Sequence, residues 1–379
     1  MIVVIADDIT GAAEIGGIGL RYGLKVLLSN DVTNTSGTDL LVVYTNTRSL
    51  PEAEAVKEMA MLTGKAVQLH PSLFYKKTDS VLRGHVLAEM KVQMEVLGFT
   101  KALLLPVNPL LGRTIQKGIY YVNGKPVHEA GFANDPEFPI SNSAVEKMLG
   151  ASKDEIKLST VSEHLSDGIT VGEASTMQEV KEWAAAGDNN ILYAGAASFF
   201  SALLRQRFVA KKMDTKPALS APLLLVSGTT YQQSIQKQAA YQEHLCSMPA
   251  EVFSQPEIES NTVQIWAERV ISQLRKTGKC IMTVGPQEGL KTDSGLLREK
   301  LSAAVAEVVK AIPLKELLVE GGATSFSIIQ KLGFTAFEPT EELQQGVVRM
   351  KVAGQDNLHV TIKPGSYAWP VAWEQAFAD

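Results

Sequence analysis

The sequence predicts an α/β fold: two layered α/β domains with mainly parallel sheets and a local β-hairpin in the N-terminal domain. Short apolar runs alternate with longer amphipathic stretches along the first 205 residues, and the alternation restarts after residue 222. Several runs, such as 40–43 and 102–105, are apolar at consecutive positions. Such runs are typical of strands that are covered on both faces, as in a parallel sheet.

In the N-terminal half, the two kinds of segment predict strands and helices in turn. The apolar runs predict strands over 2–6, 25–29, 40–45, 73–77, 102–105, 169–172 and 191–194. The amphipathic stretches predict helices over about 11–22, 52–63, 84–97, 176–186 and 196–208. Residues 119–127 depart from this alternation of strands and helices, because Asn123-Gly124 lies between two β-prone segments. Asn-Gly accepts the positive φ of a tight turn, so we expect a β-hairpin there, with Pro126 on an edge strand.

A basic stretch over 205–222 marks the expected boundary between the domains. It contains Arg205, Arg207, Lys211, Lys212, Lys216, Pro217 and Pro222. We expect a solvated linker; a basic arm that binds nucleic acid is the alternative, which a net-acidic chain disfavours. The predicted domains are therefore 1–210 and 220–379. In the second domain, strands are expected over 222–227, 279–284, 316–320 and 358–363, and helices over 231–244, 262–276, 295–311 and 325–331.

The composition excludes several classes of protein. Of 379 residues, 45% are hydrophobic and 20% are charged, which is typical of globular domains and not of disordered chains, collagen or coiled coils. The net charge of −5 gives no reason to expect nucleic-acid binding. No apolar run reaches the roughly 18 residues of a membrane span. We therefore expect no membrane partner. The two cysteines, Cys246 and Cys280, lack metal-ligand spacing, so we expect a reduced, cytoplasmic protein. The sequence does not decide whether the protein forms a homodimer.

Polar residues follow the first predicted strand at once, as Asp7-Asp8-Ile9-Thr10-Gly11. In open α/β sheets, ligands bind at the carboxyl ends of the strands. A carboxylate pair at such an end can orient hydroxyl groups or accept a proton. The structural alternative is that Asp8 or Thr10 only caps the next helix and that Asp7 is a solvated turn residue.

Further polar loops follow other predicted strands. The densest of them offers cations, a proton acceptor and hydroxyl groups at Lys77, Thr78, Asp79, Ser80 and Arg83. A loop arginine, Arg48, follows the strand over 40–45, and Arg113 follows the rigid Pro-Gly loop over 106–112. Each has a structural alternative, in which Asp79 or Ser80 only caps the next helix, Arg48 is a surface arginine, and 106–112 is no more than a rigid turn.

Three glycine sites follow predicted strands of the C-terminal half. They are Ser227-Gly228-Thr229-Thr230, Glu320-Gly321-Gly322-Ala323-Thr324 and Lys363-Pro364-Gly365-Ser366. Glycine at such junctions lets a phosphate approach the backbone, and three sites in one domain favour a nucleotide ligand. The sequence has no Walker A loop and no complete Gly-x-Gly-x-x-Gly. This disfavours a P-loop enzyme and a nicotinamide-dependent dehydrogenase.

Taken together, these motifs resemble the four-carbon acid sugar kinase family. The resemblance rests on 7–12, on 77–80 with Arg83-Gly84, on 112–114 and on 121–136, in the family's order. It implies an enzyme that uses ATP and Mg²⁺ to phosphorylate a four-carbon sugar acid such as threonate or erythronate. It also implies that the N-terminal domain binds the sugar acid and that the C-terminal domain binds the nucleotide.

The resemblance further implies roles for two sets of residues. The substrate pocket would be lined by Asp8, Arg48, Lys77, Thr78, Asp79, Ser80 and Arg83. The nucleotide would be held by Ser227, Gly321, Gly322, Ala323, Thr324 and Gly365. We expect Arg48 or Arg83 to pair with the substrate carboxylate. Asp79, or else Asp8, is expected to orient and deprotonate the attacking hydroxyl.

Two positions depart from the family's pattern. Ala323 stands where the family usually has an acidic residue, and the motif that begins at Lys363 is less rich in glycine and aromatic residues. These departures motivate a rival hypothesis, a binding protein of the same fold without ATP chemistry. A sugar-acid dehydrogenase is a third hypothesis, and the missing dinucleotide fingerprint counts against it.

Overall fold

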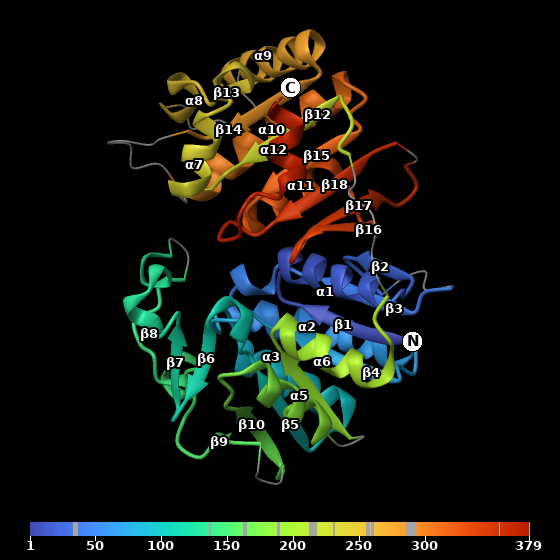
Figure 1. Cartoon of the computed structure of the whole chain (residues 1–379), viewed down its shortest axis with the longest axis vertical. Coiled ribbons are helices and arrows are strands. Elements are labelled where there is room, and N and C mark those ends of the chain that lie inside the picture. Colours follow the sequence, from blue (N-terminus) through green and yellow to red (C-terminus); the bar gives the residue numbers. More distant parts are fainter. Residues whose placement is uncertain are drawn as a thin grey trace. The chain divides into compact units, whose positions relative to one another are not determined.

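The structure is a computed structural model. It describes residues 1–32, 37–135, 138–161, 165–187, 190–211, 218–229, 232–254, 258, 261–285, 293–355 and 357–378. The chain forms two compact units, Met1–Lys212 and Met213–Asp379, which we call unit 1 and unit 2 (Figure 1). Each unit has a mainly parallel sheet between layers of helices, so the predicted α/β class is confirmed.

The main sheet of unit 1 is parallel throughout, in the order β2-β3-β1-β4-β11-β5-β10-β9. Ala6 of β1 pairs with Tyr44 of β3 on one side and with Lys77 of β4 on the other, so these three strands end side by side. All three are buried along their whole length, which explains their continuous apolar runs. The strands are β1 (Ile2–Ala6), β2 (Val26–Ser29), β3 (Leu40–Tyr44), β4 (Leu73–Lys77), β5 (Lys101–Leu105), β9 (Ile156–Ser159), β10 (Gly168–Gly172) and β11 (Ile191–Gly195).

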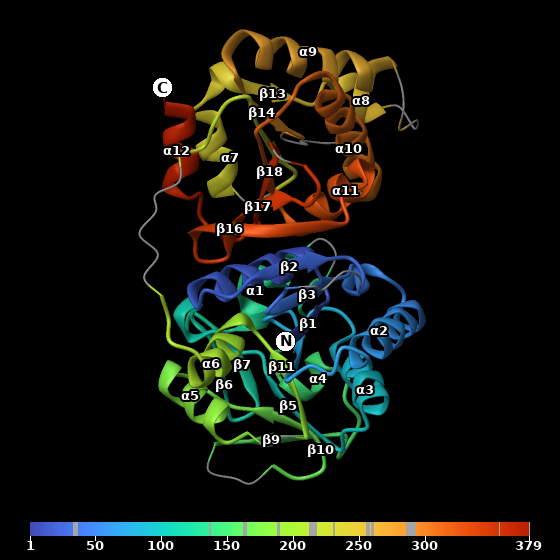
Figure 2. The same ribbon diagram turned by 90° about the vertical axis from the view of Figure 1, so that its right-hand side faces the viewer.

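Helices cover both faces of this sheet. Figure 2 shows α2 and α3 on one face and α1, α5 and α6 on the other. Helix α1 begins directly after β1 because the Asp8 carboxylate accepts a hydrogen bond from the Gly11 backbone N–H at 2.7 Å. The helices are α1 (Ile9–Arg21), α2 (Glu52–Val67), α3 (Val86–Leu97), α4 (Val145–Met148), α5 (Met177–Ala185) and α6 (Ala197–Arg207).

A small antiparallel sheet lies in the connection between β5 and β9. It has the order β6 (Arg113–Gln116), β7 (Ile119–Val122), β8 (Lys125–Pro126). Asn123 and Gly124 have φ values of +51° and +78° at the tip between β7 and β8. Both values fit the hairpin turn that Asn-Gly favours, so the predicted hairpin is confirmed, with Pro126 on an edge strand.

The sheet of unit 2 is parallel over β13-β14-β12-β15-β18 and continues antiparallel through β17 to β16. Figure 2 shows α7 and α12 on one face of this sheet and α10 and α11 on the other. The strands are β12 (Leu223–Ser227), β13 (Leu245–Ser247), β14 (Lys279–Thr283), β15 (Glu316–Glu320), β16 (Ala336–Gln344), β17 (Val347–Val352) and β18 (His359–Lys363). The helices are α7 (Gln232–Ala239), α8 (Ala250–Ser254), α9 (Asn261–Thr277), α10 (Ser294–Ala311), α11 (Gly322–Leu332) and α12 (Val371–Ala378).

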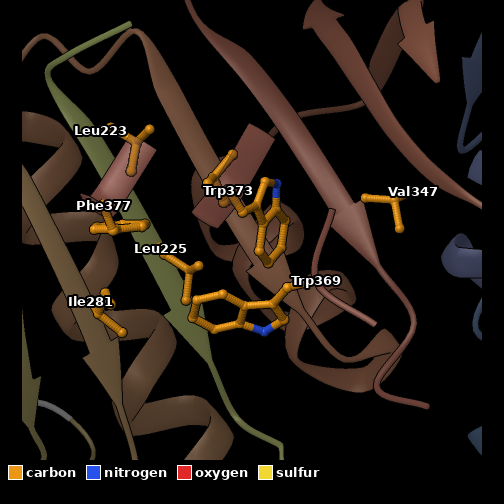
Figure 3. Packing of buried hydrophobic residues seen from close by; sticks show 8 residues of the cluster. Leu223, Leu225, Ile281, Val347, Trp369, Trp373 and Phe377 are labelled. Atoms are coloured by element: carbon orange, nitrogen blue, oxygen red, sulfur yellow. The ribbon is translucent and has the colours of Figure 1, made fainter. Parts of the chain in front are cut away.

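An aromatic cluster closes one face of unit 2 (Figure 3). Trp373 and Phe377 are four positions apart on α12, so they lie on one face of that helix. They pack with Leu223 and Leu225, which point to the same face of β12, and with Trp369. The C-terminal segment therefore completes the core of this unit.

Every predicted strand is present, with bounds that differ by one residue at most. The sequence analysis missed the strands β6, β9, β13, β16 and β17 and the helices α4, α8 and α12. Strand β16 contains Pro339 and several glutamates, which hide the strand pattern. The expected linker was wrong at its start, because Arg205 and Arg207 lie in the last turn of α6. Of that stretch, residues 212–217 lie outside the described residues. No helix in the described part of the chain is long and apolar enough to cross a membrane.

Candidate active site

A cluster of charged side chains lies where β1, β3 and β4 end in unit 1. Its centre is Arg48, which follows β3 in a short 3-10 turn. The Arg48 guanidinium donates from Nε to Asp7 Oδ2 at 2.9 Å and from Nη1 to Asp8 Oδ2 at 3.0 Å. Its Nη1 also lies 3.7 Å from Asp79 Oδ1. We call these four residues the Arg48 cluster.

Asp79 is held by a second arginine. Arg83 donates from Nε and Nη2 to the two carboxylate oxygens of Asp79, at 2.9 and 2.8 Å. The backbone N–H groups of Val81 and Arg83 add two bonds of 3.2 Å to Oδ2. Arg83 then donates from Nη1 to Asp135 at 2.7 Å. Both oxygens of Asp79 are thus engaged within the protein.

The three aspartates differ in acidity. Burial alone would raise the pKa of Asp8, but the charges of Arg48 and Lys77 outweigh it and hold that pKa below its usual range. For Asp79, burial is outweighed by Arg83 and Arg48, and its pKa lies well below the usual range. For Asp7, burial prevails over Arg48, and its pKa is raised. Asp8 and Asp79 are therefore carboxylates at neutral pH.

Two buried oxygens of this region have no hydrogen-bond partner among the described residues, Asp7 Oδ1 and Thr78 Oγ1. Buried polar atoms are usually paired, so such atoms mark places where a ligand or a water molecule is needed. Next to them, Lys77 Nζ donates to the Thr78 carbonyl at 2.9 Å and lies 4.0 Å from Glu14 Oε2. The interpretation of Asp7 as a solvated turn residue is wrong, because its side chain is only 3% exposed.

The small sheet adds a further arginine. Arg113, the first residue of β6, donates from Nη1 to the Ser80 hydroxyl. Its guanidinium lies over the Phe132 ring, 5.3 Å from the ring centroid, and the Arg83 guanidinium lies 5.6 Å from the same centroid. The Tyr120 hydroxyl donates to the Ser80 carbonyl. Ser80 is therefore fixed from the side of the small sheet.

The glycine sites of unit 2 also meet at one sheet edge, because β12, β15 and β18 are neighbours. Gly321 precedes α11 with a φ of +102°, which favours glycine, and its N–H donates to the Lys363 carbonyl at 2.9 Å. The first N–H groups of α11 have no partner within the helix, so this end suits an anion. A Cβ atom added at Gly228 would overlap Thr324 Oγ1. The first two sites are thus in direct contact.

We expect Gly228→Ala to destabilise unit 2 by about 1–3 kcal/mol, because the added methyl group overpacks this contact. Thr324→Ala, which removes the overlapping hydroxyl, is expected to recover most of the loss in the double variant. Chemical unfolding of the single and double variants measures both effects. The matched control is Gly64→Ala in α2, where the added Cβ meets nothing within 4 Å. An equal loss in the control would contradict the overlap as the cause.

A buried ion pair lies beneath the glycine sites. Lys363 Nζ is 2.8 Å from Glu320 Oε1, and both side chains are fully buried. Lys363 also donates to the carbonyls of Pro364 at 2.9 Å and Tyr367 at 2.5 Å, which shapes the loop around Gly365. The Ser227 hydroxyl donates to Glu320 at 2.9 Å. The sequence analysis missed Glu320 and Lys363 as partners, although each is a charged residue at the end of an apolar strand.

Comparison with known protein families matches the two units separately. The model of a sugar-binding N-terminal domain matches residues 2–203, and the model of a nucleotide-binding C-terminal domain matches residues 224–367. The first match alone covers more than half of the chain. The chain belongs to the four-carbon acid sugar kinase family.

Curated members of the four-carbon acid sugar kinase family are similar to this chain, over most of it or over part of it. A 3-oxo-tetronate kinase of Salmonella typhimurium is 25% identical over 383 residues, which cover 91% of each chain. A D-threonate kinase of the same organism is 33% identical over 150 residues, which cover 39% of this chain and 36% of that one. A crystal structure of a Salmonella typhimurium protein shares the fold, with a TM-score of 0.83 at 20% identity over 99% of this chain and 98% of that one.

In this family member, the structure joins most of the predicted substrate residues into one network. Contacts link Asp8, Arg48, Asp79 and Arg83. Ser80 follows Asp79 in the chain and accepts a hydrogen bond from Arg113. The sequence analysis missed Asp7 as a partner of Arg48, Asp135 as a partner of Arg83, and Phe132. Asp135 and Phe132 lie within the 121–136 stretch, but their contacts with Arg83 join segments about 50 residues apart and could not be predicted from it. In unit 2, the Ser227 side chain is buried and bound to Glu320, so a nucleotide contact by it stays a prediction.

The described residues offer little to a metal ion. Among them, no group of three or more His, Cys, Asp or Glu side chains gathers as a metal site. Glu320, the carboxylate nearest the glycine sites in sequence, is fully buried and paired with Lys363. Ala323 supplies no ligand. These residues do not fit a protein-held Mg²⁺ at the glycine sites, and we derive no step through one.

Proposed function

We propose that this chain is an ATP-dependent kinase that phosphorylates a hydroxyl group of a four-carbon sugar acid. The observation that carries the proposal is the Arg48 cluster, which lies within the segment that the sugar-binding family model matches. Relatives named 3-oxo-tetronate, D-threonate and D-erythronate kinase support the substrate class. On this proposal, residues 1–210 bind the sugar acid and residues 220–379 bind ATP.

Asp8 is our candidate for the residue that contacts the attacking hydroxyl. Its side chain is the most exposed of the three aspartates, at 12% compared with 3% for Asp7 and 8% for Asp79. Its lowered pKa keeps it a carboxylate, which accepts a hydrogen bond from the hydroxyl and takes the proton as the phosphoryl group transfers. Both oxygens of Asp8 also accept hydrogen bonds, from Gly11, Thr10 and Arg48, so its greater exposure is what favours it. Asp79, which is less exposed and is held by two hydrogen bonds from Arg83, acts as a positioning residue on this proposal.

The phosphates of ATP are assigned to the start of α11. The backbone N–H groups of Gly322, Ala323 and Thr324 lie in its first turn and suit an anion. Lys363 fixes the loop that carries Gly365 through its hydrogen bonds to the Pro364 and Tyr367 carbonyls. Catalysis then consists of positioning and charge stabilisation.

The test is release of ADP over a panel of acids, namely both enantiomers of threonate and erythronate, and 3-oxo-tetronate. We expect turnover of at least one acid, with one phosphate transferred for each ADP released. The Asp8→Asn variant controls for contaminating kinases. A folded wild-type protein that releases no ADP with any of these acids would refute the proposal.

The rival is a binding protein of the same fold that lacks ATP chemistry. It is favoured by Ala323 and by the buried pairing of Glu320, which leave no carboxylate ligand for Mg²⁺ among the described residues of the glycine sites. Calorimetry with ATP and Mg²⁺ separates the two functions. Nucleotide binding supports the kinase, whereas binding of a sugar acid without any binding of ATP supports the rival.

A further inference from the structure

Four cationic side chains lie in or next to the Arg48 cluster, and three of them already lie beside carboxylates. Arg48 pairs with Asp7 and Asp8, and Arg83 pairs with Asp79 and Asp135. Lys77 Nζ lies 4.0 Å from Glu14. A substrate carboxylate at any of these three would have to compete with an existing ion pair.

Arg113 is different. Among the described residues, its only side-chain hydrogen bond goes to a neutral group, the Ser80 hydroxyl, and it forms no ion pair with a carboxylate. It is close enough to Asp79 to help lower the pKa of that carboxyl. It is also only half-buried, so its remaining N–H groups can be reached by a ligand.

The guanidinium of Arg113 is held in place before any ligand arrives. Its backbone N–H and C=O both bond to Asn108, at 3.0 and 2.8 Å. Gly112, with a φ of +64°, precedes it and packs against Asn123. The Phe132 ring supports its planar face. A side chain fixed in this way loses little conformational entropy on binding.

We propose that Arg113 binds the carboxylate of the substrate and makes the site select an acid over the corresponding neutral polyol. The planar fork of N–H donors matches a carboxylate, which a lysine does not reproduce. On this proposal, the small antiparallel sheet recognises the negative charge of the substrate, because it supplies Arg113. The inference rests on the proposed function for its substrate class, and it replaces Arg48 and Arg83 as the expected carboxylate partner.

The test compares binding of an acid and a neutral analogue without ATP. The probes are the four-carbon acid that is turned over fastest, or threonate if none is, and threitol as the neutral analogue. Calorimetry is performed with wild type, Arg113→Gln and Arg113→Lys. A hydrogen bond between charged groups is roughly twice as strong as one between neutral groups. We therefore expect Arg113→Gln to bind the acid about 10- to 100-fold more weakly, with threitol affinity unchanged and Arg113→Lys intermediate.

The matched control is Lys125→Gln, an exposed cation on β8 of the same small sheet, which should leave acid affinity unchanged. Wild-type affinity of Arg113→Gln for the acid would overturn the inference, and so would an equal loss for the acid and threitol. The two proposals fail separately. If wild type binds the acid through Arg113 but releases no ADP, only the kinase proposal is lost. If wild type binds none of the acids, this inference is lost as well.

Discussion

Arg48→Met is expected to destabilise unit 1 by about 3–5 kcal/mol, the usual cost of removing one partner from a buried ion pair. The Arg48 side chain is 11% exposed and lies within 4 Å of three carboxylates. Methionine fills a similar volume and supplies no charge, so Asp7, Asp8 and Asp79 are left to repel one another. Chemical unfolding, with hydrogen exchange of the β1 and β4 peptides, measures the loss and places it in unit 1.

The control for this variant is Lys65→Met, which removes a surface ion pair to Asp31. The two side chains are 42% and 35% exposed, so less than about 1 kcal/mol is expected. An equal effect of the two substitutions would show that the Arg48 cluster is not held together by its central charge.

The same variant should change the dependence of stability on pH. In wild type, Asp8 and Asp79 have lowered pKa values, so their contribution is present above the unfolded pKa of about 4 and is lost below it. Without Arg48, Asp7 and Asp8 lose the charge that lowers their pKa values most, so burial raises those two pKa values, whereas Asp79 keeps Arg83. The variant then gains stability as pH falls from 8 to 5, and its deficit relative to wild type shrinks. A deficit that is constant over this range would contradict the mechanism.

Asp8→Asn is expected to lower kcat by about 10²- to 10⁴-fold, the range for loss of a general base. Asparagine caps helices as well as aspartate does, so the start of α1 is preserved. The affinity for the sugar acid, measured without ATP, should change by only a few fold. The substitution thus separates the cap from the proposed proton acceptor, and steady-state kinetics with the best acid measures the effect.

Asp79→Asn is the comparison for Asp8→Asn. It weakens the hold on Arg83, so we expect a smaller fall in kcat together with a loss of stability. If Asp79→Asn proves stable and loses far more activity than Asp8→Asn, the two roles are exchanged. That outcome would restore Asp79 as the proton acceptor that the sequence analysis preferred.

The strands were predictable because burial on both faces leaves a local trace, as in 40–43 and 102–105. The hairpin at Asn123-Gly124 was also predictable from local sequence, because the turn depends on two adjacent residues. Strand β16 was not predictable, because an antiparallel strand with Pro339 and three glutamates, two of them adjacent, has the composition of a loop. Helix α12 was missed because its apolar face is defined by packing against β12, which is distant in sequence.

The candidate site was predictable to the extent that it follows strand ends. Asp8, Arg48 and Asp79 each come directly after a strand, and parallel strands end at one edge. The pairing among them was not predictable, because it depends on side-chain directions after three separate turns. The free charge of Arg113 was hidden for the same reason: one arginine is available only because the others already have partners.

The strand order of unit 1 has a consequence for how this protein folds. Strands β4 and β5 are consecutive in the chain but are not neighbours, because β11 lies between them and bonds to both. The sheet cannot close until Ile191–Gly195 has been synthesised, and that insertion joins segments far apart in sequence. Non-local parallel pairing of this kind is slow to form, since the entropy of loop closure comes before the contacts that offset it. A ribosome-bound chain that ends before β11 would therefore expose the edge of β4, which contains Lys76 and Lys77. In the folded protein, by contrast, Lys76 is fully buried.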